Sequence, residues 1–115
     1  MAITLNGTLL ELCVLALVYE EDQYGYKLTR QMIERFDLSE SSLYPVLRRL
    51  TKNGLLRTYD LPHDGRMRRY YALTEEGRTA YLELFEEWNS FANKVDGLLH
   101  KVEEDRRDKG GIGDE

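Results

Sequence analysis

The sequence is poor in the residues that cross-link small proteins or bind metals. Its 115 residues include one cysteine, Cys13, and two histidines. A single cysteine cannot form an internal disulfide, and no second one is available for a metal cluster. We therefore expect Cys13 to be a small buried hydrophobic side chain, and we expect no metal and no cofactor.

Long hydrophobic runs and targeting signals are also missing. The longest uncharged apolar run in the first helical region covers residues 12–19, far short of the roughly 20 residues of a membrane-spanning helix. The amino terminus lacks the basic stretch that opens a secretory signal. These absences predict a cytoplasmic protein without a membrane partner. The length of the chain is usual for a single domain.

Groups that carry catalysis are scarce as well. His63 falls in an expected turn and His100 falls late in the last helical segment, and neither has a nucleophile or a metal partner nearby in the sequence. The chain also lacks a glycine-rich phosphate loop. We predict no catalytic residues and a protein that is not an enzyme.

Only one of three segments of this acidic chain, whose total net charge is −5, has a positive net charge. Residues 39–73 hold seven bases and three acids, a net charge of +4, while residues 1–38 and 74–115 carry −3 and −6. The block includes "GRMRRYY" at 65–71. Such a block can contact phosphates, although a solvated charged surface is the alternative.

Apolar periodicity predicts three helices in the first half of the chain. The first covers residues 4–19 and is apolar on most faces, and the second follows a turn at 20–25 and stops near Asp37. The third begins at Ser41 or Ser42, which places Pro45 in its first turn, and it ends before a glycine at position 54.

Residues 55–61 and 66–73 alternate like strands around the turn signal "PHDG", so a β-hairpin follows. Thr74 is predicted to cap a long final helix. That helix carries an a/d heptad seam that no other element is long enough to cover, so we predict a homodimer. The seam consists of Tyr81, Leu84, Trp88, Phe91, Val95, Leu98 and Val102.

These elements predict a mainly α (α+β) fold, a winged helix-turn-helix with a long C-terminal dimerisation helix. In this architecture the third helix enters the major groove and the hairpin reaches the adjacent backbone or minor groove. We divide the chain into a DNA-binding domain at 1–73, a dimerisation helix at 74–107 and a disordered tail at 108–115.

Three motifs also resemble the PadR family of bacterial transcriptional regulators. They are "YGYKL" at 24–28, "SSLYPVLRRLTKNGLL" at 41–56 and "GRMRRYYALTEEGR" at 65–78. The C-terminal part, a single helix rather than a multihelix domain, is similar to that of the smaller, LmrR-like subfamily of multidrug sensors. The resemblance implies a double-stranded, pseudo-palindromic DNA operator as partner.

The basic block and its neighbours supply the candidate DNA contacts. Arginines can bond phosphate or guanine, and the serines either donate to phosphate or cap the helix. For Tyr26 and Lys27 the alternatives are core packing and solvation. The candidates are Tyr26, Lys27, Ser41, Ser42, Tyr44, Arg48, Arg49, Lys52, Arg66 and Arg68.

Strand alternation divides the arginines of the hairpin. Arg69 shares its face with Met67, Tyr71 and Leu73, so this face is predicted to pack on the domain. Arg66 and Arg68 then point elsewhere and are the better DNA candidates. We expect Arg69 to form a structural ion pair or to extend toward solvent.

The single tryptophan, Trp88, lies in the seam. In the LmrR-like subfamily the motif resembling "FEEW" at 85–88 places it in a pore between subunits, where planar drugs stack. The alternative is an ordinary interface anchor. One turn later the subfamily has an acidic residue where this chain has an alanine, a loss for which Glu11 or Glu87 could substitute. Candidate ligand residues are Trp88, Phe85, Phe91, Ala92, Gly7 and Glu11.

The function predicted from the sequence is a homodimeric repressor of the PadR type, released from DNA by a small planar hydrophobic or drug-like effector at the dimer interface. The alternative is a winged-helix protein-interaction module in which the heptad serves oligomerisation alone. Discrimination between DNA sequences separates the two.

Overall fold

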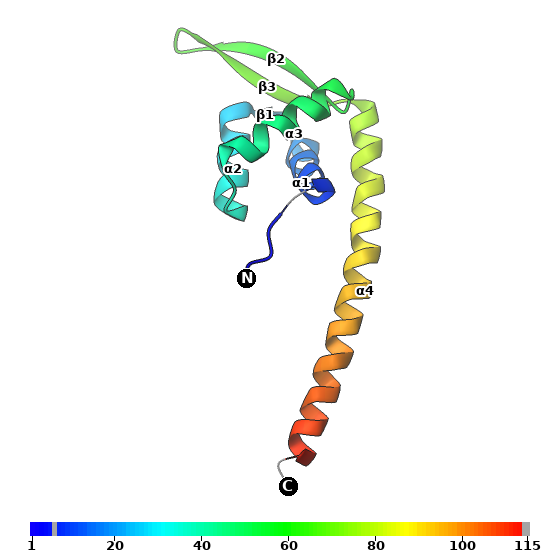
Figure 1. Cartoon of the computed structure of the whole chain (residues 1–115). Helices are drawn as coiled ribbons and strands as arrows, with labels where there is room; N and C mark the ends of the chain where they lie inside the picture. The colour runs from blue at the N-terminus through cyan, green and yellow to red at the C-terminus, as the bar shows by residue number, and fades with distance from the viewer. Residues whose placement is uncertain (6, 114–115) are drawn as a thin grey trace. The chain divides into compact units, whose positions relative to one another are not determined.

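The computed structural model describes residues 1–5 and 7–113. Its helices and one small antiparallel sheet confirm the mainly α winged-helix class (Figure 1). The chain divides into two units, residues 1–83 and residues from 84 onward. The elements are α1 (Gly7–Glu20), β1 (Gln23–Tyr24), α2 (Gly25–Phe36), α3 (Glu40–Lys52), β2 (Leu56–His63), β3 (Arg66–Leu73) and α4 (Glu75–Gly113).

Helix α1 forms the centre of the first unit. Val14 and Leu15 are fully buried, and Leu10 and Val18 are nearly so, which confirms a helix covered on most faces. Cys13 was predicted to be buried but is only half-buried. That partial burial raises the pKa of its thiol, while Arg35 acts in the opposite direction, so the side chain is a poor nucleophile at neutral pH.

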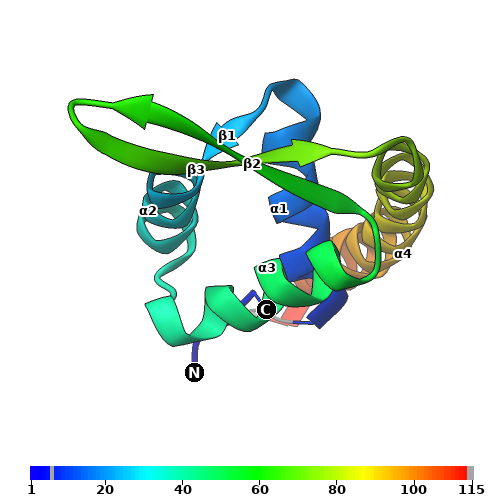
Figure 2. The ribbon, with the colours of Figure 1, turned by 90° about the horizontal axis from the view of Figure 1, so that it is seen from above.

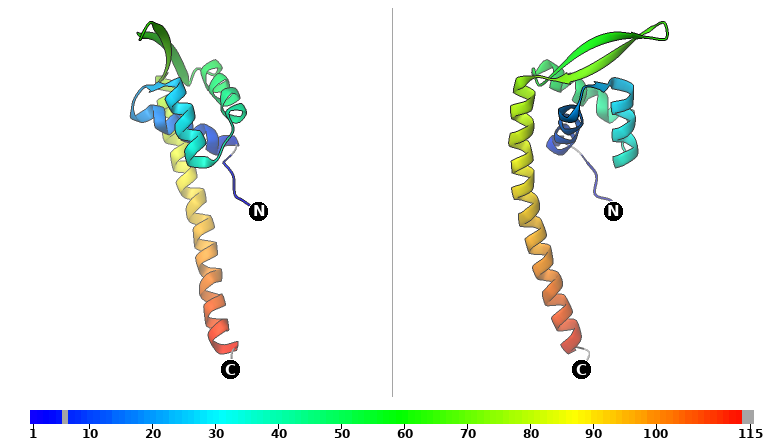
Figure 3. Two further views of the ribbon diagram at one scale, coloured as in Figure 1. Left: turned by 90° about the vertical axis from the view of Figure 1, so that its left-hand side faces the viewer. Right: turned by 180° about the vertical axis from the view of Figure 1, so that it is seen from behind.

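Helices α2 and α3 are amphipathic and bury one face each against this centre. Leu28 and Met32 of α2 and Leu43 and Leu50 of α3 are each about 1% exposed. Viewed from above, the sheet lies over the three helices, and the side and rear views agree (Figures 2 and 3). Helix α2 ends as predicted at Asp37, whose φ of 54° is left-handed and stops the helix.

Helix α3 begins earlier than the sequence predicted. Its N-cap is Ser39, in extended conformation, so the helix starts at Glu40 rather than at Ser41 or Ser42. The local signal was ambiguous because several serines compete for the cap. Pro45 therefore lies in the second turn instead of the first, where it removes the N–H that would bond the carbonyl of Ser41. Ser41 is exposed, so water can satisfy that carbonyl.

The sheet has the strand order β1-β3-β2 and is antiparallel throughout. Strand β1 lies in the segment 20–25, which was predicted to be a turn, because two residues are too few for alternation to be detected. Gln23 pairs with Tyr71 and is 6% exposed. Its side-chain amide donates to the carbonyl of Leu17 over 3.0 Å and accepts from Gln31 over 3.4 Å, so the buried polar group is satisfied.

The hairpin turn is tighter than predicted. It consists of Asp64 and Gly65, whose φ angles of 51° and 77° belong to the two-residue turn that favours Asp-Gly. The sequence predicted a turn at 62–65, whereas Pro62 and His63 belong to β2 and pair with β3. Strand β2 is an edge strand, the place in a sheet where a proline is tolerated because its missing N–H can face solvent.

The start of α4 is fixed to the end of α3, and the predicted cap is confirmed. The N–H of Gly77 donates to Oγ1 of Thr74 over 2.9 Å, and that hydroxyl donates to the carbonyl of Gly54 over 2.6 Å. Gly54 has the positive φ of 78° expected after a helix C-terminus. One threonine therefore caps α4 and ties it to the turn that follows α3.

The first turns of α4 pack with the first unit, which explains why that unit reaches Glu83 instead of ending at residue 73. The ring of Tyr81 lies 4.6 Å from that of Tyr19 on α1, and the guanidinium of Arg78 lies 4.9 Å from the ring of Tyr19. Tyr81 was predicted to face a second copy, but the structure packs it on α1 of its own chain.

Helix α4 continues to Gly113, past the predicted end at residue 107. Residues 108–115 were predicted to be disordered, but the helix includes residues 108–113. Just before them, Glu103 pairs with Arg106 and Arg107 at helical spacing. Such pairs support a helix in the absence of apolar contacts. The last two residues of the predicted tail, 114–115, lie outside the described part of the chain.

Candidate nucleic-acid interface

The face of α3 opposite its buried leucines carries candidate DNA contacts. Tyr44 is 50% exposed, and Arg48 and Lys52 are exposed. These three side chains follow one another at intervals of four residues, so they form a row along one side of the helix. A row of a phenol and two cations presents hydrogen-bond donors along the helix.

The amino end of α3 adds hydroxyl groups to this row. Ser41 and Ser42 lie in the first turn and are exposed. Their Oγ atoms lie 2.9 Å and 3.0 Å from Oγ of Ser39, the N-cap. The three hydroxyls are thus clustered where the positive end of the helix dipole favours an anion.

Arg49 does not join this row, because it is paired with Glu11 of α1. Its Nε lies 2.8 Å from Oε1 of Glu11. The Arg49 side chain is 47% exposed and that of Glu11 is 24% exposed. The pair links α1 to α3, so a predicted DNA contact and a predicted ligand residue bind each other.

The start of α2 presents two further candidates at the surface. Tyr26 is 65% exposed, which excludes core packing, and Lys27 is exposed as well. Inside the same turn the hydroxyl of Thr29 donates to the carbonyl of Gly25 over 2.9 Å. A Cβ on Gly25 would lie 3.1 Å from Cε2 of Tyr71, so the small residue lets this helix start approach β3.

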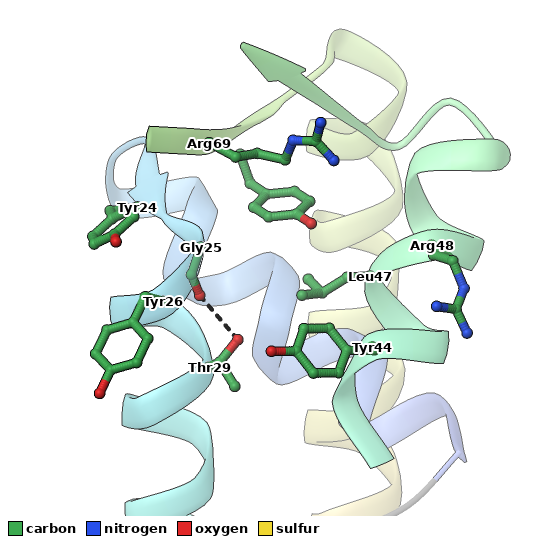
Figure 4. Close-up of a pocket in the computed structure, with 9 residues that line it drawn as sticks. Tyr24, Gly25, Tyr26, Thr29, Tyr44, Leu47, Arg48 and Arg69 are labelled. Atoms are coloured by element: carbon green, nitrogen blue, oxygen red, sulfur yellow. Dashed lines mark hydrogen bonds between the residues drawn. The ribbon is translucent and has the colours of Figure 1, made fainter. Parts of the chain in front are cut away.

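These elements surround a hollow of about 400 Å³, which we call the α2–α3–β3 hollow. Figure 4 shows Arg69 on the strand side, with Tyr44 and Leu47 reaching in from α3 and Tyr26 on α2. None of the described residues that line it is acidic. Its lining consists of Tyr24, Gly25, Tyr26, Thr29, Tyr44, Leu47, Arg48, Arg69 and Tyr71.

A second hollow of about 380 Å³ continues along α3 toward its carboxyl end. It shares Leu47, Arg48, Arg69 and Tyr71 with the first, and it adds Lys52 and residues of α3 and β2. The two hollows therefore form one trough between α3 and the hairpin, with three basic side chains and no acidic one among the described lining residues.

The strand register confirms the predicted division of the hairpin arginines. Asp60 pairs with Arg69, and Leu61 pairs with Arg68, so successive arginines point to opposite faces. Arg69 shares the face of Tyr71, which lines the trough. The sequence predicted that this face packs on the domain, but Met67 near the tip is 65% exposed, where the hairpin extends beyond the helices beneath it.

Arg66 and Arg68 lie on the opposite face of the hairpin, which we call the outer face. The guanidinium of Arg68 lies 4.5 Å from the ring centroid of Tyr24, a cation–π contact that holds it over β1. Arg66 is exposed and pairs with His63 beside the turn. Neither arginine lines the α2–α3–β3 hollow.

Tyrosines stiffen the outer face. The rings of Tyr59 and Tyr70 stack at 5.5 Å with 9° between their planes, and Tyr24 lies 5.7 Å from Tyr70. The Tyr59 hydroxyl donates to Asp22 over 2.6 Å, and this hydrogen bond is the main reason that the pKa of Tyr59 is raised. The cross-strand rings join all three strands, so they hold the hairpin in one orientation.

Arg69 is the cation that sequence reasoning assigned away from the interface. Its Nε lies 3.6 Å from Oδ1 of Asp60, which confirms the predicted ion pair, yet its side chain remains 64% exposed and lines both hollows. Burial raises the pKa of Tyr71, Arg69 opposes this shift and Tyr44 adds to it. Arg69 on the same strand and Tyr44 on α3 thus both act electrostatically on Tyr71.

The second unit presents an exposed apolar stripe on α4. Along the predicted seam, Trp88 and Val95 are each 38% exposed, and Phe91, Leu98 and Val102 are more than half exposed. Leu84 is half-buried. An apolar stripe at heptad spacing with this exposure is typical of a helix that pairs with another helix.

The predicted ligand residues fall into both units. Trp88 and Phe91 pack with ring centroids 6.5 Å apart, and Phe85 and Ala92 lie on the same helix. Gly7 begins α1 in the first unit. Glu11 lies on the same helix and is paired with Arg49. The residues of the second unit alone form an aromatic surface centred on Trp88.

Each of the two histidines contacts a residue close to it in the sequence. His100 bonds the backbone carbonyl of Asp96 over 2.7 Å, and His63 lies 3.2 Å from its neighbour Asp64. Within the parts of the chain that the structure describes, no group of three or more histidine, cysteine or carboxylate side chains is placed to hold a metal ion. None of the described helices is long and apolar enough to cross a membrane.

Comparison with known proteins identifies the family that this chain matches. Residues 14–83, more than half of the chain, match the model of the "Transcriptional regulator PadR-like family". The matched segment contains every residue of the trough between α3 and the hairpin. A Lysinibacillus sphaericus protein described as "Uncharacterized protein X" is 32% identical over 82% of this chain and 91% of its own length.

Solved structures agree with this assignment. The crystal structure of smu.1704 from Streptococcus mutans UA159 is 36% identical and has a TM-score of 0.80, covering 87% of this chain and 94% of its own. A PadR-like transcriptional regulator (BC4206) from Bacillus cereus strain ATCC 14579 is 31% identical with a TM-score of 0.72, covering 78% and 90%.

Proposed function

Because this chain belongs to the PadR-like family of transcriptional regulators, we propose that it acts as a homodimeric repressor of the LmrR-like, multidrug-sensing type. In this proposal it binds a pseudo-palindromic operator and leaves it when a planar hydrophobic ligand binds between the subunits. The observation that carries the DNA-binding part is the trough between α3 and the hairpin, with three basic and no acidic described lining residues.

The proposed DNA contacts follow the exposed side of α3. Tyr44, Arg48 and Lys52 enter or border the major groove, and the serine hydroxyls at the amino end of α3 reach a phosphate. Tyr26 and Lys27 at the start of α2 contact the backbone of the same half-site. Arg66 is the proposed contact of the hairpin tip, and Arg68 reaches DNA only by leaving the ring of Tyr24.

Selection of bound duplexes from a random pool tests the DNA-binding function. A repressor enriches one half-site repeated about one helical turn, or a multiple of a turn, away. A protein-interaction module enriches no sequence and binds selected and scrambled duplexes equally, which would overturn the proposal.

The proposed dimer uses the exposed stripe of α4. Its apolar side chains repeat every three or four residues from Leu84 to Val102, and all of them except the half-buried Leu84 are exposed in the single chain. Burying two such stripes against each other removes apolar area from water at about 25 cal/mol per Å². A twofold axis would then place two reading helices for the two half-sites.

The proposed effector stacks on Trp88, because a half-exposed indole beside Phe91 offers a flat apolar surface. Trp88 is the only tryptophan, so its fluorescence reports on this place alone. We expect saturable quenching by some members of a panel of planar aromatic compounds, together with weaker binding to the selected duplex. Compounds that leave both the emission and the DNA affinity unchanged across the whole panel would contradict the effector proposal.

A further inference from the structure

The hairpin contains an acidic side chain directly opposite the arginine that lines the trough. Asp60 of β2 and Arg69 of β3 are register partners, and Nε of Arg69 lies 3.6 Å from Oδ1 of Asp60. Both are partly solvated, with 45% of the Asp60 side chain and 64% of the Arg69 side chain exposed. The ion pair is therefore weak and can be exchanged for another anion at little cost.

The surroundings of Arg69 favour an anion. Arg69 lines both hollows together with Arg48, and Lys52 lies in the second one. Asp60 itself lines neither hollow. The guanidinium therefore lies between a carboxylate on its own hairpin and a cationic trough without acidic lining residues, and it can turn toward either one.

We propose that Arg69 binds a DNA phosphate at the trough between α3 and the hairpin, and that Asp60 competes with this phosphate for the same guanidinium. This inference rests on the DNA-binding function proposed above. It adds a backbone contact on the face of the hairpin that lines the trough to the contact proposed for Arg66 at the tip. Arg66 and Arg68 lie on the outer face and line neither hollow.

Competition between Asp60 and the phosphate predicts an effect that a positively charged patch alone does not predict. When DNA binds, its phosphate must displace Asp60 from the guanidinium of Arg69. The negative charge of Asp60 then remains beside the phosphate. Removing this carboxylate should therefore strengthen DNA binding, and it should do so only while Arg69 is present. The dependence on Arg69 distinguishes competition from a general decrease in negative charge.

The experiment measures the affinity of the full chain for its selected duplex by fluorescence anisotropy at several salt concentrations. Asp60→Asn should tighten binding about threefold, the scale of a solvated ion pair. Asp64→Asn is the matched control: it neutralises an acid of the same hairpin, at a left-handed turn position that asparagine tolerates, and it should have a smaller effect. Circular dichroism verifies that both variants fold.

The arginine variants complete the test. Arg69→Ala should weaken binding and decrease the slope of log K against log salt by about one, as expected for one lost phosphate contact. Arg57→Ala removes the same charge from an exposed position of β2 that lines neither hollow, and it should change the slope less. In the Arg69→Ala background, Asp60→Asn should no longer tighten binding.

Two kinds of result would overturn the inference. If Asp60→Asn behaves like Asp64→Asn, or if its effect persists without Arg69, then Asp60 does not compete at this site, although the DNA-binding function stands. If the wild-type chain binds selected and scrambled duplexes equally, the proposed function fails, and the phosphate site fails with it.

Discussion

Gly77→Ala should lower the free energy of unfolding by about 2–3 kcal/mol, although alanine is otherwise a better helix residue than glycine. A Cβ at this position would lie 2.0 Å from the carbonyl oxygen of Leu55 and 2.7 Å from Cδ1 of Leu73. The oxygen belongs to the backbone, so no rotamer change relieves the clash. The first turn of α4 would have to move away from the end of α3.

Gly97 provides the matched control on the same helix. A Cβ there meets no atom within 4 Å, so Gly97→Ala should raise stability by up to about 1 kcal/mol through helix propensity alone. Urea unfolding of the two variants and the wild type measures both effects. Equal stability of Gly77→Ala and wild type would show that the carbonyl oxygen of Leu55 leaves room for a Cβ at position 77.

Leu98→Asp should abolish the proposed dimer at micromolar concentration. Leu98 is 62% exposed on the apolar stripe, and in a twofold pair its substitution would bury two like charges against each other. Like charges juxtaposed at an interface cost several kcal/mol, which corresponds to a weakening of at least about a hundredfold. Analytical ultracentrifugation measures the change, and DNA affinity should fall with it because two half-sites are no longer bound together.

Asn93→Asp is the control for this substitution. Residue 93 is exposed on the same helix, and it lies outside the a and d positions, so it adds the same charge away from the seam. This variant should sediment like the wild type. A wild-type chain that sediments as a monomer, or a Leu98→Asp variant that remains dimeric, would contradict the proposed dimer.

The sequence predicted those features that depend on local pattern. Hydrophobic periodicity located the helices, Thr74 identified the start of α4, and strand alternation separated Arg68 from Arg69. Each of these signals lies within a few residues of the feature that it predicts. The boundaries were less certain where signals competed, as at Ser39, where neighbouring serines offered equivalent caps.

The features that sequence reasoning missed depend on contacts between distant segments. Strand β1 exists only because Gln23 and Tyr24 pair with β3, about 50 residues away in the sequence. Alternation correctly grouped Arg69 with Tyr71, but it could not show that this face also borders α3. Likewise, Arg49 looked free on its helix until α1 brought Glu11 to it. Tertiary packing, rather than residue type, decided these roles.

We propose that α3 and the trough beside it provide sequence-specific DNA binding. The most direct measurement is the ratio of affinities for the duplex selected from a random pool and for a scrambled duplex of equal length, at physiological salt. We predict a ratio of about 10³ or more, as for specific DNA-binding proteins generally. A ratio near one would contradict the central claim, because the basic residues would then contact only the phosphates and would not discriminate between base sequences.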